Sequence, residues 1–268
     1  MSGDKASSAD NQQETRYYFS GFLTGEGSLS LIKATNRRGG TGFYYTPDIT
    51  VSNADLNLLR RFNQVIAGGR GIISPIKGGY NLSVRGKEKV KPVLTFLSDY
   101  PPICGNLIRE KISILSKALL ILSKKKNRNR RLPGEVARIE KLRERLKEIK
   151  KIGEPKRFFS QVRANRKQTG SFLAGIVDAE GSMGFRKSGS RLQPYFCILM
   201  REEAIIDLFL RYFGFGQKYY RPAEKLFHFE TAKRENVLRL CQFFLRECPL
   251  RLVKNQKRMK KILRILND

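Results

Sequence analysis

The sequence predicts an α+β fold of two similar halves, and three observations support this prediction. A nine-residue phrase occurs at residues 19–27 and again at residues 173–181, an offset of 173 − 19 = 154 residues. After each copy, strands with alternating apolar residues and helices with periodic apolar residues follow in the same order. A strongly basic stretch separates the two series. An internal repeat of this kind indicates two halves that pair face to face.

Each copy of the phrase is an apolar helical stretch that ends in a carboxylate, Glu26 or Glu180. The glycines that follow, Gly27 and Gly181, are expected to adopt the left-handed conformation that ends many helices. Each carboxylate then lies at the negative end of its helix dipole, which disfavours it by up to ~1 kcal/mol. If the two helices pack together, the carboxylates repel or share a proton unless a hard divalent cation such as Mg²⁺ binds between them.

Small residues near the start of each phrase predict where the two helices touch. Gly21 and Gly175 lack side chains, so the helix backbones can approach closely at these positions. Ser20 and Ala174 precede them and favour the same close approach. We therefore predict a helix interface at these four residues.

The predicted elements repeat after each phrase. The first series has strands at 28–34, 43–52, 71–75 and 80–85, and helices at 55–66, 87–97 and 107–122. The second has strands at 183–187, 195–200, 218–221 and 227–231, and helices at 202–213, 233–247 and 254–265. We divide the chain into a polar, disordered tail (1–13), a first half (14–122), a basic linker with a helix (123–167) and a second half (168–268).

The phrase resembles the motif of the LAGLIDADG homing endonucleases, and the second copy, LAGIVDAEG, is close to it letter for letter. The resemblance implies a single-chain, two-motif DNA endonuclease with two pseudo-symmetric αββαββα repeats, paired through the motif helices. Each repeat would carry an antiparallel sheet that lies as a saddle in the DNA major groove. The family's other acidic position is Asp178 in the second copy but Thr24 in the first, so no chemical role is expected there.

The resemblance also implies the metal chemistry. Glu26 and Glu180 would be the catalytic metal ligands, with the backbone of Gly25 and Ala179 as further ligands. The expected cofactor is Mg²⁺, two or three ions, with Mn²⁺ as a substitute and Ca²⁺ supporting binding without cleavage. Cleavage across the minor groove would leave short 3′ overhangs, as expected for an enzyme of intron or gene homing.

Three further residues are candidates for the active site. In the family, a lysine at the place of Lys254 stabilises negative charge, whereas the matching residue of the first half is Asn106. Asn53 and Arg201 follow the second strand of each half, where the family often places a polar residue that orders water. For Lys254, a phosphate contact or a solvated position remains an equally good interpretation.

Side chains that alternate outward along the strands are candidates for base recognition. In the first half these are Ser30, Asn36, Arg38, Asn81, Ser83 and Arg85, and in the second Arg186, Ser188, Ser190 and Gln193. Arg85 or Arg186 could pair with guanine edges. Lys124, Lys125, Lys126 and Arg128 of the linker are candidates for phosphate contact, or are simply solvated. Because the halves differ at nearly every such position, we expect a monomer and a long asymmetric target.

Composition agrees with a polyanionic partner. The chain has 53 Lys and Arg against 24 Asp and Glu, a net charge of +29. Its apolar runs fall short of the ~20 residues that span a bilayer, so no membrane partner is expected. Cys104, Cys197, Cys241 and Cys248 lack CxxC spacing, and His228 alone cannot supply a histidine-rich zinc site. Reduced thiols and the absence of a secretory signal favour an intracellular protein of an organelle (mitochondrion or chloroplast) or the prokaryotic cytoplasm.

Two alternatives come from other functional classes. An RNA maturase that assists intron splicing is expected to have lost a catalytic acid, but both acids are present. A non-cutting DNA-binding regulator on the same fold would usually add a helix-turn-helix domain after the repeats, and the sequence continues with none. The endonuclease interpretation is therefore preferred.

Overall fold

The structure is a computed structural model that describes residues 3–35, 43–124, 132–152, 155, 158–160, 162–189 and 191–267. It divides into two compact units. We call Met1–Glu26, Pro102–Gly105 and Ser160–Asp268 the motif unit, and Gly27–Pro101 with Asn106–Phe159 the linker unit. This division differs from the expected one, because the first motif helix packs with the C-terminal half and the linker helix packs with the first sheet.

Two long helices, α1 (Gly3–Glu26) and α6 (Arg166–Glu180), carry the repeated phrases and pack against each other in the motif unit. Helix α6 begins with a capping box, in which Asn165 accepts from the Gln168 N–H at 2.8 Å and Gln168 accepts from the Asn165 N–H at 3.0 Å.

The tail expected to be disordered is instead helical from residue 3 to residue 13. No proline interrupts it, and the packed part of α1 already provides the nucleus from which a helix propagates at little cost. Gln13 bonds Gln168 of α6 at 3.0 Å, which ties the end of this extension to its partner helix.

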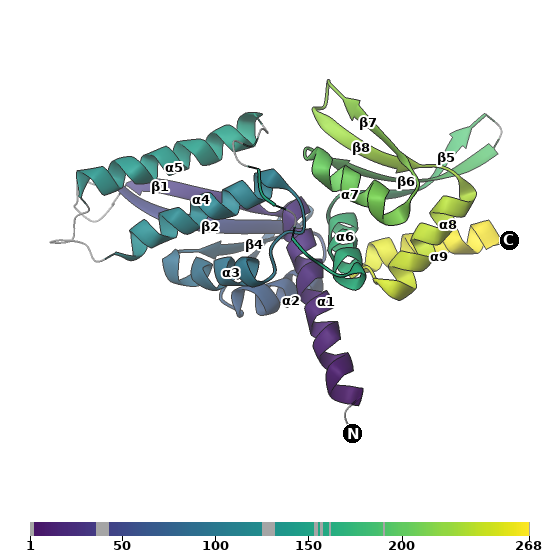
Figure 1. The fold of residues 1–268 in the computed structure, drawn as a ribbon, viewed down its shortest axis with the longest axis horizontal. Coiled ribbons are helices and arrows are strands. Elements are labelled where there is room, and N and C mark those ends of the chain that lie inside the picture. Colours follow the sequence, from purple (N-terminus) through teal and green to yellow (C-terminus); the bar gives the residue numbers. More distant parts are fainter. Residues whose placement is uncertain are drawn as a thin grey trace. The chain divides into compact units, whose positions relative to one another are not determined.

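The motif unit also holds a four-stranded antiparallel sheet in the order β5-β6-β8-β7 (Figure 1). Its strands are β5 (Gly181–Ser188), β6 (Arg191–Met200), β7 (Gln217–Arg221) and β8 (Leu226–Thr231). The helices that follow are α7 (Glu203–Phe213), α8 (Arg234–Gln242), the π-helical segment η1 (Phe243–Glu247) and α9 (Val253–Asn267). One continuous helix was predicted where α8 and η1 stand, so only its last turn differs. Phe196, Phe229 and Phe244 are fully buried between sheet and helices.

The linker unit contains a second sheet of the same design, ordered β1-β2-β4-β3 (Figure 1). Its strands are β1 (Ser28–Thr35), β2 (Phe43–Asn53), β3 (Ile72–Ile76) and β4 (Gly79–Arg85). Its helices are α2 (Leu56–Ala67), α3 (Lys87–Asp99), α4 (Asn106–Ser123) and α5 (Pro133–Ile152). The predicted α+β fold with two antiparallel sheets is thus confirmed, and the strand bounds differ from prediction by a few residues at most.

The two faces of each sheet differ in chemistry because side chains alternate along a strand. In the linker unit, Leu29, Ile49 and Leu82 occupy paired positions and are buried under the helices. The opposite face carries mostly polar residues, and we call it the polar face of the sheet. The motif unit repeats this arrangement, with Phe196 and Phe229 on the helix-covered face. Within the described ranges, no helix is long and apolar enough to cross a membrane.

Candidate active site

The two motif helices touch through their glycines, and the contact follows the sequence repeat. A Cβ added at Gly21 would lie 2.9 Å from the carbonyl carbon of Phe172, with the carbonyl oxygen nearer still. A Cβ at Gly175 would lie 3.0 Å from the carbonyl carbon of Tyr18, again with the oxygen nearer. The offsets 175 − 21 and 172 − 18 both equal 154, so the two contacts are related as the two phrases are.

The residues before these glycines complete the interface. Ser20 and Ala174 are both fully buried. The Ser20 hydroxyl has no hydrogen-bond partner among the described residues. The small size of these side chains, rather than their polarity, permits the close approach.

This close packing brings the two motif acids together at the ends of α1 and α6. A Cβ added at Gly25 would collide with the Ala179 side chain and lie 3.2 Å from Cγ of Glu180. Burial raises the pKa of Glu26 to about 7. Burial, and then the charge of Glu26, raises the pKa of Glu180 to about 7. Although burial is the main cause of this shift, Glu180 keeps part of its surface in contact with solvent, which screens part of the repulsion.

An acid pair of this kind suits a hard divalent cation. Both carboxylates resist ionisation in the absence of a counter-charge, and oxygen ligands are those that Mg²⁺ and Ca²⁺ prefer. Within the described part of the chain, no cluster of three or more His, Cys, Asp or Glu side chains could hold a metal ion. An ion held by the two acids would take further oxygen ligands from water or substrate. A role for the backbone of Gly25 and Ala179 as ligands stays a prediction.

The glycines after the motif acids do not adopt the left-handed conformation that the sequence predicts. Gly181 is extended, with φ −75° and ψ 134°, and neither Gly27 nor Gly181 has a positive φ. A Cβ at Gly181 would lie 3.0 Å from Cγ1 of Val177 and closer to the Val177 carbonyl oxygen. Glycine is thus required here for close approach to the preceding turn, and the chain passes directly from α6 into β5.

Asp178, which has no expected chemical role, is a buried structural acceptor. Its Oδ2 accepts from the Tyr18 hydroxyl at 2.6 Å and from the backbone N–H groups of Arg251 and Leu252 at 2.6 and 2.9 Å. Its Oδ1 accepts from Nδ2 of Asn255 at 3.0 Å. Burial raises the pKa of the Asp178 carboxyl, while these donors act to lower it. The carboxylate thereby joins α1, α6 and the start of α9.

The segment that Asp178 holds carries Lys254. Lys254 is the second residue of α9 and is exposed. Its neighbours Leu252 and Asn255 are both bonded to Asp178, so the backbone that presents Lys254 is fixed. Arg201, in the same unit, directly follows the last residue of β6 and is exposed. Their catalytic roles stay predictions.

The corresponding residues of the first half lie in the linker unit. Asn53 ends β2, and its Oδ1 accepts from the Asp55 N–H at 2.9 Å. Asn106 begins α4, and its Oδ1 accepts from the Phe159 N–H at 3.0 Å. Both side chains therefore have local structural bonds, and a catalytic role for Asn53 stays a prediction.

The candidates for base recognition that the structure describes lie on the polar faces of the two sheets. The Ser30 hydroxyl donates to the backbone oxygen of Asp48 at 3.4 Å, and Asn81 accepts from Ser52 at 2.9 Å. Ser83, Arg85, Arg186 and Gln193 all take part in side-chain bonds on these faces. Outside the described residues lie Asn36, Arg38, Lys125, Lys126, Arg128 and Ser190, together with the side chain of Ser188.

Two acidic residues of the polar faces escaped the sequence analysis. Asp48 accepts from Ser83 and Arg85, and Glu230 accepts from Arg186 and Tyr219. The sequence could have placed them on the polar faces, because side chains of neighbouring strand residues point to opposite faces. Asp48 precedes the buried Ile49, and Glu230 follows the buried Phe229.

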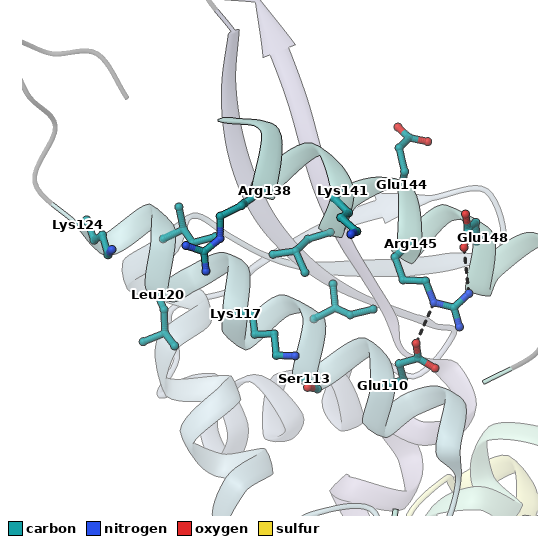
Figure 2. A pocket seen from close by; sticks show the side chains of 13 residues that line it. Glu110, Ser113, Lys117, Leu120, Lys124, Arg138, Lys141, Glu144, Arg145 and Glu148 are labelled. Atoms are coloured by element: carbon teal, nitrogen blue, oxygen red, sulfur yellow. Dashed lines mark hydrogen bonds and ion pairs between the residues drawn. The ribbon is translucent and has the colours of Figure 1, made fainter. Parts of the chain in front are cut away.

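The described part of the linker unit also contains a groove between α4 and α5, with a volume of about 940 Å³ (Figure 2). Figure 2 shows Arg145 at one end, bonded to Glu110 at 2.9 Å and to Glu148 at 3.1 Å. Lys124, a candidate phosphate contact, lines the other end together with Arg138. The groove contains none of the predicted catalytic residues.

The chain is thus an α+β protein with two antiparallel sheets of the same strand order and two packed helices that each end in a glutamate. A search with the sequence finds no matching family profile and no matching curated protein. Among solved structures, the chain has the fold of the single-chain, two-motif LAGLIDADG homing endonucleases.

Three of these structures illustrate the likeness. I-GzeII in complex with its DNA target matches with a TM-score of 0.77 and 17% identity over 94% of this chain and 89% of that chain. I-LtrWI bound to target DNA matches with a TM-score of 0.77 and 14% identity over 96% and 91% of the two chains. I-SmaMI bound to an uncleaved DNA target in the presence of calcium ions matches with a TM-score of 0.70 and 17% identity over 94% and 97%. The predicted resemblance is confirmed for the fold.

Proposed function

We propose that this protein is a site-specific DNA endonuclease that makes a double-strand break in a long, asymmetric target. The observation that carries the proposal is the acid pair, in which Glu26 and Glu180 meet at the ends of α1 and α6 with both pKa values raised to about 7. The DNA-bound endonucleases that share the fold support it. So does the net charge of +29, which favours a polyanion.

The proposed chemistry is metal-dependent hydrolysis of phosphodiesters. A divalent ion held by the acid pair would supply a Lewis acid and a more acidic bound water, so the proposed chemistry does not require a histidine base. Glu26 and Glu180 would hold Mg²⁺, each acid serving one scissile strand. Lys254 would place its ammonium near the negative charge that develops on the phosphate. Cleavage across the minor groove would leave short 3′ overhangs, and the protein would act as a monomer in the intracellular compartment that holds its target.

The test is cleavage of a randomised duplex DNA library by the whole chain, in Mg²⁺ and separately in Ca²⁺, with sequencing of the cut ends. We expect one long asymmetric site, cut in Mg²⁺ and bound without cutting in Ca²⁺. Glu26→Gln and Glu180→Gln should each abolish double-strand cleavage while leaving DNA binding within a few-fold of wild type. Gln keeps the size of the side chain but removes the charge that holds the metal.

Glu203→Gln is the matched control. Glu203 is an exposed acid of α7 paired with Lys218 at 2.8 Å, in the same unit as the motif acids. Its substitution should leave cleavage unchanged. Double-strand cutting by purified Glu180→Gln, or binding without cutting in every metal tried, would contradict the proposed function.

A further inference from the structure

Two carboxylates on the polar faces, Asp48 and Glu230, hold arginines of those faces. We propose that these carboxylates determine sequence specificity, because each fixes one arginine, Arg85 or Arg186, in position to recognise a guanine. The inference rests on the proposed function and adds a feature of the substrate: a guanine in the part of the target that each sheet contacts.

The charge of the chain makes these acids notable. A carboxylate on a DNA-binding surface repels phosphate, and the chain has only 24 Asp and Glu against 53 Lys and Arg. Each of these two acids is paired with an arginine of the same face. Their presence is explained if the acid improves recognition of a base edge more than it weakens attraction to the backbone.

Asp48 bonds the guanidinium of Arg85 from the neighbouring strand. Asp48 and Arg85 are direct partners in the register of β2 and β4. The Asp48 side chain is 5% exposed, and its Oδ2 lies 3.1 Å from Nη2 of Arg85, whose side chain is 59% exposed. Ser83 fixes the other carboxylate oxygen by a bond of 2.9 Å. The acid is therefore bonded at both oxygens and shielded from solvent, while the guanidinium remains accessible.

Glu230 holds the guanidinium of Arg186 in the same way in the motif unit. Nη1 of Arg186 donates to Glu230 at 2.6 Å, and its Nε donates to Gln193 at 3.2 Å. Tyr219 donates to the second oxygen of Glu230, and its ring stacks on His228 with centroids 4.7 Å apart. The side chain of Glu230 is 18% exposed and that of Arg186 is 48% exposed.

Both arginines keep enough donors for a base. A guanidinium has five N–H groups. Hydrogen bonds to described residues use one of these groups in Arg85 and two in Arg186. Those of Arg186 leave both hydrogens of Nη2 and one of Nη1 for a base. Two adjacent donors are what bidentate bonding to O6 and N7 of guanine requires. Holding the guanidinium in advance removes part of the entropy cost of ordering a long side chain on binding.

The experiment is selection of bound sequences from a randomised duplex library in Ca²⁺, comparing wild type with single variants. We expect wild type to prefer guanine at one position for each arginine, by roughly 5- to 150-fold over other bases. Arg85→Ala and Arg186→Ala should each abolish the preference at one position and leave the other intact. Asp48→Asn and Glu230→Gln should weaken the preference at the same position as their own arginine.

Conservative variants separate base recognition from phosphate contact and from misfolding. Arg85→Lys keeps the charge but not the planar pair of donors, so it should lose the guanine preference while the salt dependence of affinity stays unchanged. Arg85 is largely exposed, so this variant tests the inference even if Asp48→Asn fails to fold. Glu140→Gln and Glu203→Gln are matched controls, because these acids bond Lys33 and Lys218 away from the polar faces. Both should leave the base preferences unchanged.

The outcomes are distinguishable. Sequence-selective binding whose guanine preferences survive Arg85→Lys and Arg186→Ala would overturn this inference and leave the proposed function standing. A loss of preference for cytosine in Asp48→Asn or Glu230→Gln, without change at a guanine, would overturn it as well, since the carboxylate would then contact the base directly. Failure of wild type to enrich any DNA sequence would overturn both proposals.

Discussion

Replacing Gly21 by alanine should destabilise the protein, although alanine is the better helix former. The added methyl group would lie 2.9 Å from the carbonyl carbon of Phe172 and nearer to its oxygen, whereas ordinary contact begins at 3.4 Å. At Gly175 the Cβ would lie 2.6 Å from the Phe22 nitrogen, so helix backbones would have to separate by at least 3.4 − 2.6 = 0.8 Å. Backbone atoms cannot rotate away as a side chain could.

The magnitude follows from two opposing effects. Overpacking of a tight interface costs about 1–3 kcal/mol and at times more. The gain in helix propensity from Gly to Ala is at most ~1 kcal/mol. Because the obstacle is the partner backbone, we expect a net loss of roughly 1–3 kcal/mol for Gly21→Ala and for Gly175→Ala. Urea unfolding followed by far-ultraviolet circular dichroism measures this loss.

Gly134→Ala provides the control. Gly134 lies in helix α5, and a Cβ there meets no atom within 4 Å. This substitution should leave stability unchanged or raise it slightly, since it removes backbone freedom from the unfolded chain without a collision. If Gly21→Ala proved as stable as wild type, or changed stability by the same amount as Gly134→Ala, the close packing of α1 on α6 would be refuted.

Three further predictions concern polar groups. Ser20→Ala should leave the free energy of unfolding unchanged or raise it, because the buried hydroxyl has no described partner; a loss above ~1 kcal/mol in urea unfolding would contradict this. Asp178→Ala should destabilise the fold by about 3 kcal/mol or more, since four donors lose their acceptor, and the same assay measures it. Bonds from Lys33 and Tyr45 lower the pKa of Glu140 from 4.5 to about 2, so they stabilise the fold above pH 4.5 and lose this effect as the pH falls towards 2. The destabilisation by Glu140→Gln should therefore be largest near pH 7 and shrink steadily in unfolding series at lower pH.

The parts of the fold that the sequence predicts well are those with a strong local period. Strand β1 alternates half-buried Ser28 and Ser30 with buried Leu29 and Leu31, and the same alternation is visible in its residue types. Helix α2 begins after Asp55, whose side chain accepts from the Leu58 N–H, and ends at left-handed Gly68, both common signals. The acid pair was predictable because a repeated phrase places Glu26 and Glu180 at equivalent positions.

The parts that the sequence does not predict depend on neighbours distant in the chain. The bond from Arg186 to Glu230 joins β5 to β8, and it forms because β6 lies between them in the sheet. No local pattern fixes that strand order. The helical extension at residues 3–13 was missed for a related reason, since its polar composition resembles that of a disordered tail.

The difference between Asp178 and Thr24 gains a physical explanation from these contacts. The Thr24 hydroxyl donates to the Ser20 carbonyl at 2.8 Å, a bond within its own helix that any threonine at this spacing can make. Asp178 instead accepts from Tyr18 of the partner helix and from the turn that leads into α9. A carboxylate buried in this way costs desolvation energy that its four donors offset. The position two residues before each motif glutamate, Thr24 or Asp178, therefore acts in packing, and the proposed metal site rests on Glu26 and Glu180.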